Sequence, residues 1–154
     1  MVTSTHNRAA DDPLALEQQV CFALAVASRT VISVYRPVLE PLGLTHPQYL
    51  VMLALWGAEP LSVTELSRML ELDAGTLSRL LKRLESAGLV RRDRNPTDER
   101  SLAVTLTGKG CALREQALSV PGTVLDRLDM DLDDLVVLRD RLTDVIGAAK
   151  AAHD

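Results

Sequence analysis

Residues 61–106 alternate helical and extended patterns in an order that strongly limits the fold. Two short segments with helical spacing come first, TELSRMLEL and AGTLSRLLKRLESAG, and we expect Thr64 to open the first and Asp73 to cap the second. Two β-like segments follow, LVRRDR and SLAVTL, and the NPTDER stretch between them is rich in turn-forming residues. Two short helices at a tight turn, followed by a hairpin, predict a winged helix-turn-helix.

Helices are also predicted before this unit. Asp12 followed by Pro13 is typical of a helix start, and apolar residues at helical spacing continue to about residue 40. Pro37 is expected to kink or interrupt the last turns of this helix, because a proline ring clashes with the preceding turn. Thr45 is then expected to cap a second helix, which ends near Trp56.

Helical patterns return after the hairpin. Thr107 is expected to cap a helix, Pro121 and Gly122 to interrupt it, and a last helix to span about residues 131–149. The terminal helices have apolar faces and little domain left to cover them, which predicts a homodimerisation layer.

The fold class is therefore mainly α, an α+β winged helix-turn-helix domain whose N- and C-terminal helices form a homodimerisation layer. We expect four parts: a flexible N-terminus at 1–12, a dimerisation helix and its connection at 13–46, a winged domain at 47–110 and C-terminal dimerisation helices at 111–150. Within the winged domain, the recognition helix is expected at about 74–87 and the wing at about 89–106.

Composition excludes several classes of protein. No apolar run approaches the roughly 18 residues needed to cross a membrane, and the N-terminal MVTSTHNRAADD lacks the apolar core of a secretion signal. Only two cysteines occur, 90 positions apart, which is no disulfide framework, so a cytoplasmic location is expected. The three histidines are scattered, and we expect neither a metal nor a cofactor.

Charge is distributed unevenly along the chain. The formal net charge is −4, yet residues 76–94 contain six basic and two acidic residues, whereas residues 111–154 contain nine acidic and five basic ones. A basic middle within an acidic chain suits a polyanionic partner such as double-stranded DNA, although a solvated charged helix has the same composition.

The second helix of a helix-turn-helix turns a polar face to the major groove and an apolar face to the core. In residues 74–87 the polar and basic side chains lie opposite a stripe of leucines, and the candidate DNA contacts are Thr76, Ser78, Arg79, Lys82 and Arg83. Arginine reads guanine in a bidentate manner, so we expect Arg79 near bases and Lys82 and Arg83 mainly at phosphates.

The hairpin tip is the second candidate contact. A short β-wing with arginine at its tip can enter the minor groove, where the electrostatic potential is most negative. We expect Arg100 to play this part, Asp98 to orient its guanidinium by a charge-assisted hydrogen bond, and Arg94 to assist from across the hairpin. The alternative is an ordinary surface turn.

The run from LSVTELSRMLEL to SLAVTLTGKG resembles the winged helix-turn-helix of MarR-family regulators. The features that carry the resemblance are LKRLESAGLVRR, the DER at the wing and the LTGKG helix start. The resemblance implies a homodimer with the terminal helices at its interface. It also implies that two recognition helices read a pseudo-palindromic operator whose half-sites lie about one helical turn apart.

The segments VCFALAVASR and VYRPVLEPLGLTHPQYLVMLALW are similar to the OhrR branch of that family, the organic hydroperoxide sensors. This similarity implies that a hydroperoxide oxidises Cys21 and that the repressor then leaves its operator. It also implies that Tyr35 hydrogen-bonds the partner subunit's Cys21. Tyr35 lies 14 residues beyond Cys21 on the same predicted helix, about 21 Å at 1.5 Å per residue, and so cannot reach its own thiol.

Two positions depart from the pattern of that branch. His46 precedes PQY where the family usually has a second thiolate-binding tyrosine, and Ala25 stands where some relatives have another. An imidazole can also donate a hydrogen bond, and a protonated His46 would stabilise a thiolate more strongly and make reactivity depend on pH between about 5 and 8. Tyr49 is either a substitute for the missing tyrosine or a half-buried core residue.

The second cysteine, Cys111, lies away from the place where two-cysteine relatives carry a resolving thiol, and we interpret it as structural. A sulfenic acid at Cys21 is therefore expected to react with a small cellular thiol. One alternative is a regulator of the same family that responds to a small aromatic ligand, with Cys21 incidental. Another is a thiol peroxidase, but no catalytic pair is evident, and the sequence predicts that the protein is not an enzyme.

Overall fold

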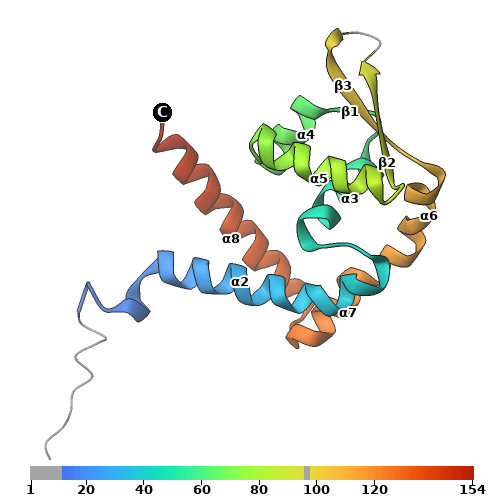
Figure 1. Ribbon diagram of the computed structural model, residues 1–154. Coiled ribbons are helices and arrows are strands. Elements are labelled where there is room, and N and C mark those ends of the chain that lie inside the picture. Colours follow the sequence, from blue (N-terminus) through green and yellow to red (C-terminus); the bar gives the residue numbers. More distant parts are fainter. Residues whose placement is uncertain (1–11, 96–97) are drawn as a thin grey trace, which may run out of the picture.

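The computed structural model describes residues 12–95 and 98–154, and the side chains of residues 95–101 are outside that description. Most of the predicted flexible segment 1–12 therefore lies outside the described residues. The chain is mainly helical with one small sheet, as predicted, and Figure 1 shows its elements. The helices are α2 (Val20–Leu39), α3 (His46–Gly57), α4 (Val63–Leu70), α5 (Ala74–Ser86), α6 (Gly108–Ala117), α7 (Val120–Leu128) and α8 (Leu132–Ala151), and the strands are β1 (Leu61–Ser62), β2 (Val90–Asn95) and β3 (Asp98–Leu106).

The sheet is antiparallel, with strand order β1-β3-β2. Strands β2 and β3 form the predicted hairpin, and Figure 1 shows it projecting beyond the helices. The strand stub β1 pairs with the other side of β3, with Leu61 opposite Val104. This pairing ties the chain before α4 to the base of the hairpin, so the wing and the helix-turn-helix form one unit.

The core lies between α3, α4, α5 and the sheet. It is aliphatic, as the scarcity of aromatic residues requires, and its fully buried side chains include Met52, Leu55, Leu66, Leu77, Leu81 and Val104. The predicted leucine stripe of α5 supplies four buried residues. Because these leucines recur at helical spacing, the opposite face of α5 is left for solvent or a partner.

Helix starts in the winged domain follow local capping chemistry. Thr45 and Gln48 form a capping box at α3, as the prediction of a Thr45 cap requires. Helix α4 begins earlier than predicted, because Ser62 rather than Thr64 is its cap and pairs with Glu65 in a second capping box. Thr107 caps α6 as predicted, with its hydroxyl accepting a hydrogen bond from Gly110 N at 3.1 Å.

The predicted start of the first long helix is wrong. Asp12 accepts a hydrogen bond from Leu14 N at 3.0 Å and so caps a turn. Gln19 is extended, and its side-chain amide donates to the carbonyls of Pro13 at 2.8 Å and Ala15 at 3.0 Å, which closes the preceding segment. Helix α2 therefore starts at residue 20.

Pro37, which was expected to kink or interrupt the helix, does not interrupt it, since α2 continues through it to Leu39. The helix then tightens into a 3-10 turn, Glu40–Leu42, and ends at Gly43, whose φ of 71° lies in the left-handed region that glycine adopts without strain. The break therefore comes just after the position that the sequence indicated.

The terminal helices leave much apolar surface uncovered. Helix α2 packs against α7, but α8 has no buried residue. In Figure 1 α2 extends away from the winged domain, whereas the C-terminal end of α8 reaches the turn after α4 through the Lys150–Glu71 ion pair. Their exposed large apolar side chains are Val20, Phe22, Leu24, Val31, Ile32, Leu132, Val137, Leu138, Val145 and Ile146.

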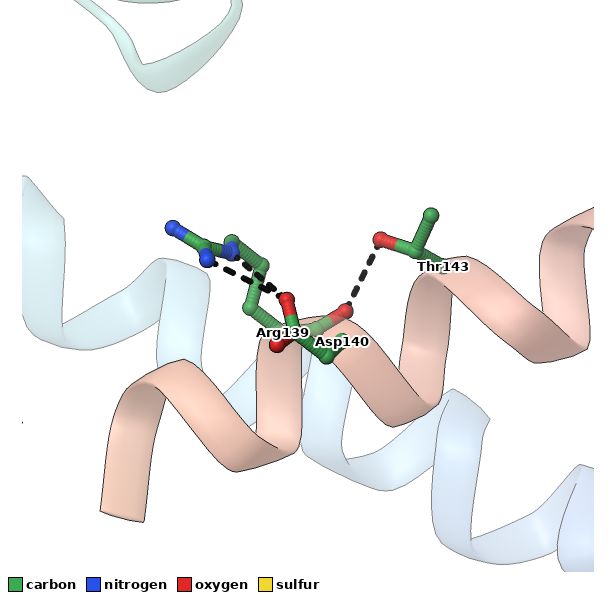
Figure 2. A network of polar contacts seen from close by, with 3 residues as sticks. All are labelled: Arg139, Asp140 and Thr143. Carbon is green, nitrogen blue, oxygen red and sulfur yellow. Dashed lines mark hydrogen bonds and ion pairs between the residues drawn. The ribbon is translucent and has the colours of Figure 1, made fainter. Parts of the chain in front are cut away.

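Three polar residues in the middle of α8 find partners within the helix itself. The Arg139 guanidinium donates to the Asp140 carboxylate at 3.1 and 3.2 Å, and the Thr143 hydroxyl donates to the Arg139 carbonyl at 2.9 Å (Figure 2). These side chains are satisfied locally, so the apolar residues are the part of α8 that gains most from a partner.

The sequence has no uninterrupted apolar run long enough to span a membrane, but mean hydropathy over a window selects one helix. Residues 20–42 form one helical stretch that is long and apolar enough to span a bilayer, on length and composition alone. The sequence-based expectation required an uninterrupted apolar run, whereas a mean over a window tolerates a charged residue such as Arg29. The core helix of a soluble protein passes the same test.

Candidate DNA interface and thiol site

Helix α5 has one buried and one exposed face. The leucines 77, 80, 81 and 84 are buried, whereas Ser78, Arg79, Lys82 and Arg83 are exposed and Thr76 is half-buried. The structure thus gathers the five predicted contact residues of this helix along one polar and basic surface. Such a helix can enter the major groove while its other face stays in the core.

The first turn of α5 is fixed by Asp73. Its carboxylate accepts hydrogen bonds from Thr76 N at 2.8 Å and from the Thr76 hydroxyl at 2.7 Å. Both bonds, with the Arg79 charge, lower the pKa of Asp73, so its carboxylate is ionised at neutral pH. A Cβ at Gly75 would lie 3.3 Å from Asp73 Oδ1, so the glycine gives the cap room.

The turn between α4 and α5 ends α4 with Glu71 in the left-handed region, at φ 55°. The Ser67 hydroxyl donates to the Leu72 carbonyl at 2.5 Å and closes this turn. Lys150, near the end of α8, forms an ion pair with Glu71. The C-terminal helix therefore touches the helix-turn-helix at its turn, a contact that no sequence spacing indicated.

Two of the basic residues of β2, the first strand of the wing, have acidic partners. Arg91 forms an exposed ion pair with Asp93 at 3.0 Å, and Arg92 pairs with Glu85 at the end of α5. The second pair joins the recognition helix to β2 and is half-buried. The Glu85–Arg92 pair could not be read from the sequence, because pairing rules within a helix or across strands do not reach from a helix end to the following strand.

The wing tip is described only in part. Arg94 is exposed near the end of β2, opposite Leu102. Asp98 and Arg100 lie in β3, but the structure does not describe their side chains. The predicted Asp98–Arg100 hydrogen bond therefore stays a prediction.

Tyr35, His46 and Tyr49 form an aromatic cluster where α2 and α3 meet. The Tyr35 and His46 rings are 5.1 Å apart in an edge-on arrangement, and the Tyr35 and Tyr49 rings are 6.1 Å apart. Tyr35 and His46, predicted to act on one thiol, are thus neighbours within the same chain. Tyr49 is only 4% exposed, so it is a core residue with its ring against Tyr35.

Burial controls the protonation of this cluster. Desolvation lowers the pKa of His46 below its usual 6.5, so the neutral imidazole predominates at neutral pH in the single chain. Of the two forms considered for His46, the neutral imidazole is therefore the one that burial favours. Burial, with a smaller contribution from Tyr35, raises the pKa of Tyr49 and keeps its phenol protonated.

Cys21 lies far from this aromatic cluster. It is the second residue of α2 and is exposed. Tyr35 is 14 residues further along the same unbroken helix, about 21 Å away along its axis. Cys111 in α6 is exposed too, so exposure does not distinguish the two thiols.

A cavity of about 450 Å³ opens beside the aromatic cluster, between α2 and the start of α3. His46 lines it together with apolar residues, and Arg36 and Glu40 supply the charged groups of its wall. A cavity of this size, apolar with a few polar groups, can hold a small organic molecule.

Comparison with known proteins locates these features in a family. The sequence model of the MarR family matches residues 44–102. The chain is 43% identical over 131 residues to the organic hydroperoxide resistance transcriptional regulator of Bacillus subtilis, which covers 85% of this chain and 89% of that one. It is 46% identical over 132 residues to the transcriptional regulator TtmR of Methylorubrum extorquens, covering 86% of this chain and 68% of that one.

A solved structure matches the fold as well. The structure of reduced AbfR bound to DNA superposes with a TM-score of 0.75 at 32% identity, and the match covers 87% of this chain and 94% of that one. The winged helix and the terminal helices are therefore shared with a protein that was observed on DNA.

Proposed function

The chain belongs to the MarR family of DNA-binding transcriptional regulators, and from this premise we propose that it is a repressor that releases its operator when an organic hydroperoxide oxidises Cys21. Members of this family are not enzymes, and a regulator of this kind acts in the cytoplasm, where it meets DNA. The observation that carries the proposal is the separation of the thiol from its expected partners: Cys21 is exposed at the start of α2, whereas Tyr35 lies near the end of α2 with His46 of α3 against its ring.

A homodimer would join the two ends. If two α2 helices cross antiparallel about a two-fold axis, each Cys21 comes to the partner's Tyr35 and His46. The exposed apolar residues of α2 and α8 supply the surface for such an interface. We therefore assign the dimerisation layer to residues 13–46 and 111–150, and the DNA-binding domain to residues 47–110.

On DNA, α5 would occupy the major groove of each half-site. Arg79 would contact bases, while Lys82, Arg83 and the Ser78 hydroxyl would contact phosphates. Arg100 would enter the minor groove with Asp98 and Arg94 beside it. Arg91 and Arg92 are not included among the DNA contacts, because their side chains are already engaged in ion pairs.

The sensing step is nucleophilic attack by the Cys21 thiolate on the distal oxygen of the hydroperoxide. The S–O bond forms as the O–O bond breaks, and the alkoxide that leaves takes up a proton to become an alcohol. The sulfenic acid then condenses with a small cellular thiol, giving a mixed disulfide and water.

His46 would assist as a neutral donor. Its lowered pKa favours the uncharged imidazole, whose N–H can hydrogen-bond a thiolate without adding a positive charge. Tyr35 would supply the second donor through its phenol. Once Cys21 carries an oxygen or a bound thiol, the apolar dimer interface holds a larger polar group. This group would break the hydrogen bonds from Tyr35 and His46 and move the two recognition helices away from the spacing of the half-sites.

A second candidate function rests on the cavity beside His46. A small aromatic ligand held there, with its charged group at Arg36, would act on the same junction between α2 and the winged domain without any role for Cys21. Titrating that kind of ligand against the DNA complex under reducing conditions separates this candidate from thiol oxidation.

The test of the leading proposal is DNA release by cumene hydroperoxide. Wild-type protein and Cys111→Ser are expected to release bound DNA, and Cys21→Ser to retain it. Release by Cys21→Ser at the wild-type dose would refute the proposal.

A further inference from the structure

The Thr76 hydroxyl has only one hydrogen, and the structure shows where it goes. Thr76 Oγ1 lies 2.7 Å from Asp73 Oδ2. An ionised carboxylate can only accept hydrogen bonds, so Thr76 must be the donor of this bond. The Asp73 carboxylate is held in place by its second bond, from Thr76 N at 2.8 Å, which also caps α5.

The oxygen of Thr76 is therefore left with lone pairs and no hydrogen to donate. Phosphate oxygens are acceptors, as are guanine N7 and O6 and thymine O4, so none of them can pair with it. In the major groove only two groups donate, the N4 amino group of cytosine and the N6 amino group of adenine.

We infer that Thr76 is a specificity-determining residue that accepts a hydrogen bond from the amino group of a cytosine or adenine in each half-site, with Asp73 fixing its polarity. The inference rests on the proposed insertion of α5 into the major groove. Thr76 lies in the first turn of that helix, the part that contacts base edges in helix-turn-helix proteins.

Ser78 in the same helix provides the contrast. It is exposed, and within the described part of the chain its hydroxyl makes no hydrogen bond, so it keeps a hydrogen for a phosphate. Loss of the Ser78 hydroxyl should weaken binding to every sequence by a similar factor. Loss of the Thr76 hydroxyl should change which base is preferred at one position.

The first experiment selects bound duplexes from a randomised pool with reduced wild-type protein. The expected consensus has cytosine or adenine at one position in each half-site, favoured over other bases roughly three- to tenfold, as one added hydrogen bond allows. Thr76→Val, which has no hydroxyl, should lose this preference. Thr76→Ser should keep it, and Ser78→Ala should keep it with weaker binding overall.

The second experiment removes the amino group from the DNA. Unsubstituted purine in place of adenine, or 2-pyrimidinone in place of cytosine, keeps the ring of the base and lacks its amino group. It should weaken wild-type binding by the same factor and leave Thr76→Val unaffected. Equal weakening in both proteins would overturn the inference.

The third experiment changes the Thr76 hydroxyl from a hydrogen-bond acceptor toward the DNA to a donor. In Asp73→Asn the amide oxygen can still cap Thr76 N, while the amide NH₂ donates to Thr76 Oγ1 and frees its hydrogen. The preference should then move to the base with a carbonyl oxygen in place of that amino group, guanine instead of adenine or thymine instead of cytosine. If Asp73→Asn and Thr76→Val keep the wild-type base preference, the inference about Thr76 is wrong but the proposed DNA binding stands. If the wild-type protein enriches no sequence, the proposed DNA binding itself is wrong.

Discussion

Gly110→Ala is expected to destabilise the protein although alanine favours helix formation. Gly110 is buried in the first turn of α6, where the helix passes the Leu89 backbone. A Cβ there would lie 2.1 Å from the Leu89 carbonyl oxygen and 3.3 Å from Leu106 Cδ2. The carbonyl cannot turn away at low cost, because it also accepts a hydrogen bond from Thr107 N at 3.1 Å.

The magnitude follows from two opposed effects. Replacing glycine by alanine within a helix stabilises by about 0.5–1 kcal/mol. The overlap requires α6 or the link between α5 and β2 to move by about 1 Å, and overpacking of this kind costs about 1–3 kcal/mol or more. The Trp56 indole, which donates to the Gly110 carbonyl at 3.0 Å, would be displaced too. We expect a net loss of about 2 kcal/mol in the free energy of unfolding.

Gly108→Ala is the matched control. Gly108 opens the same helix, and a Cβ there meets nothing within 4 Å, so this variant should be as stable as wild type or slightly more so. Urea unfolding followed by circular dichroism measures both variants, at one protomer concentration because dimerisation makes stability concentration-dependent. If Gly110→Ala unfolds at the same urea concentration as Gly108→Ala, the packing argument is wrong.

Three further predictions concern stability and the wing. The pKa of His46 is lower in the folded chain than its unfolded value of 6.5, so the unfolded state binds the proton first as the pH falls. The stability of the wild-type protein therefore decreases as the pH drops through 6.5. Between pH 7.5 and 5.5, the urea midpoint should fall less in His46→Gln than in wild type. Glu85→Gln should cost at most about 1 kcal/mol in stability but weaken DNA binding by loosening the wing, and unchanged affinity in fluorescence anisotropy would contradict this role of the Arg92 pair. Leu81→Ala, at a side chain that is 0% exposed, should cost about 2–5 kcal/mol in thermal or urea unfolding, and a cost below 1 kcal/mol would place Leu81 outside the core.

The winged helix was predictable because its signals are local. Asp73 caps α5 as expected, the leucine stripe of α5 is buried, and Gly88 ends the helix with a φ of 76°. Each of these depends on residues close together in the sequence. The start of α2 was missed because Asp12 and Pro13 suit a turn as well as a helix, and the side chain of Gln19 closes that turn.

Contacts between distant segments were less accessible to prediction. The pairing of Glu85 with Arg92, and that of Glu71 with Lys150, depends on how helices and strands pack. Tyr35 and His46 were assigned to one site through family resemblance, and their ring contact arises because α2 and α3 meet after the turn at Gly43. The lowered pKa of His46 could not be inferred from the sequence, because a position beside a helix cap does not reveal burial.

The most direct test of the central claim follows the thiol and the DNA together. Reduced protein is bound to a duplex selected from the randomised pool, cumene hydroperoxide is added, and fluorescence anisotropy of the DNA is recorded alongside the mass of the peptides that contain Cys21 and Cys111. If oxidation of Cys21 causes release, DNA release and the added mass at Cys21 rise together with dose. Release that precedes any change in the Cys21 peptide, or full oxidation of Cys21 with the DNA still bound, would contradict this claim.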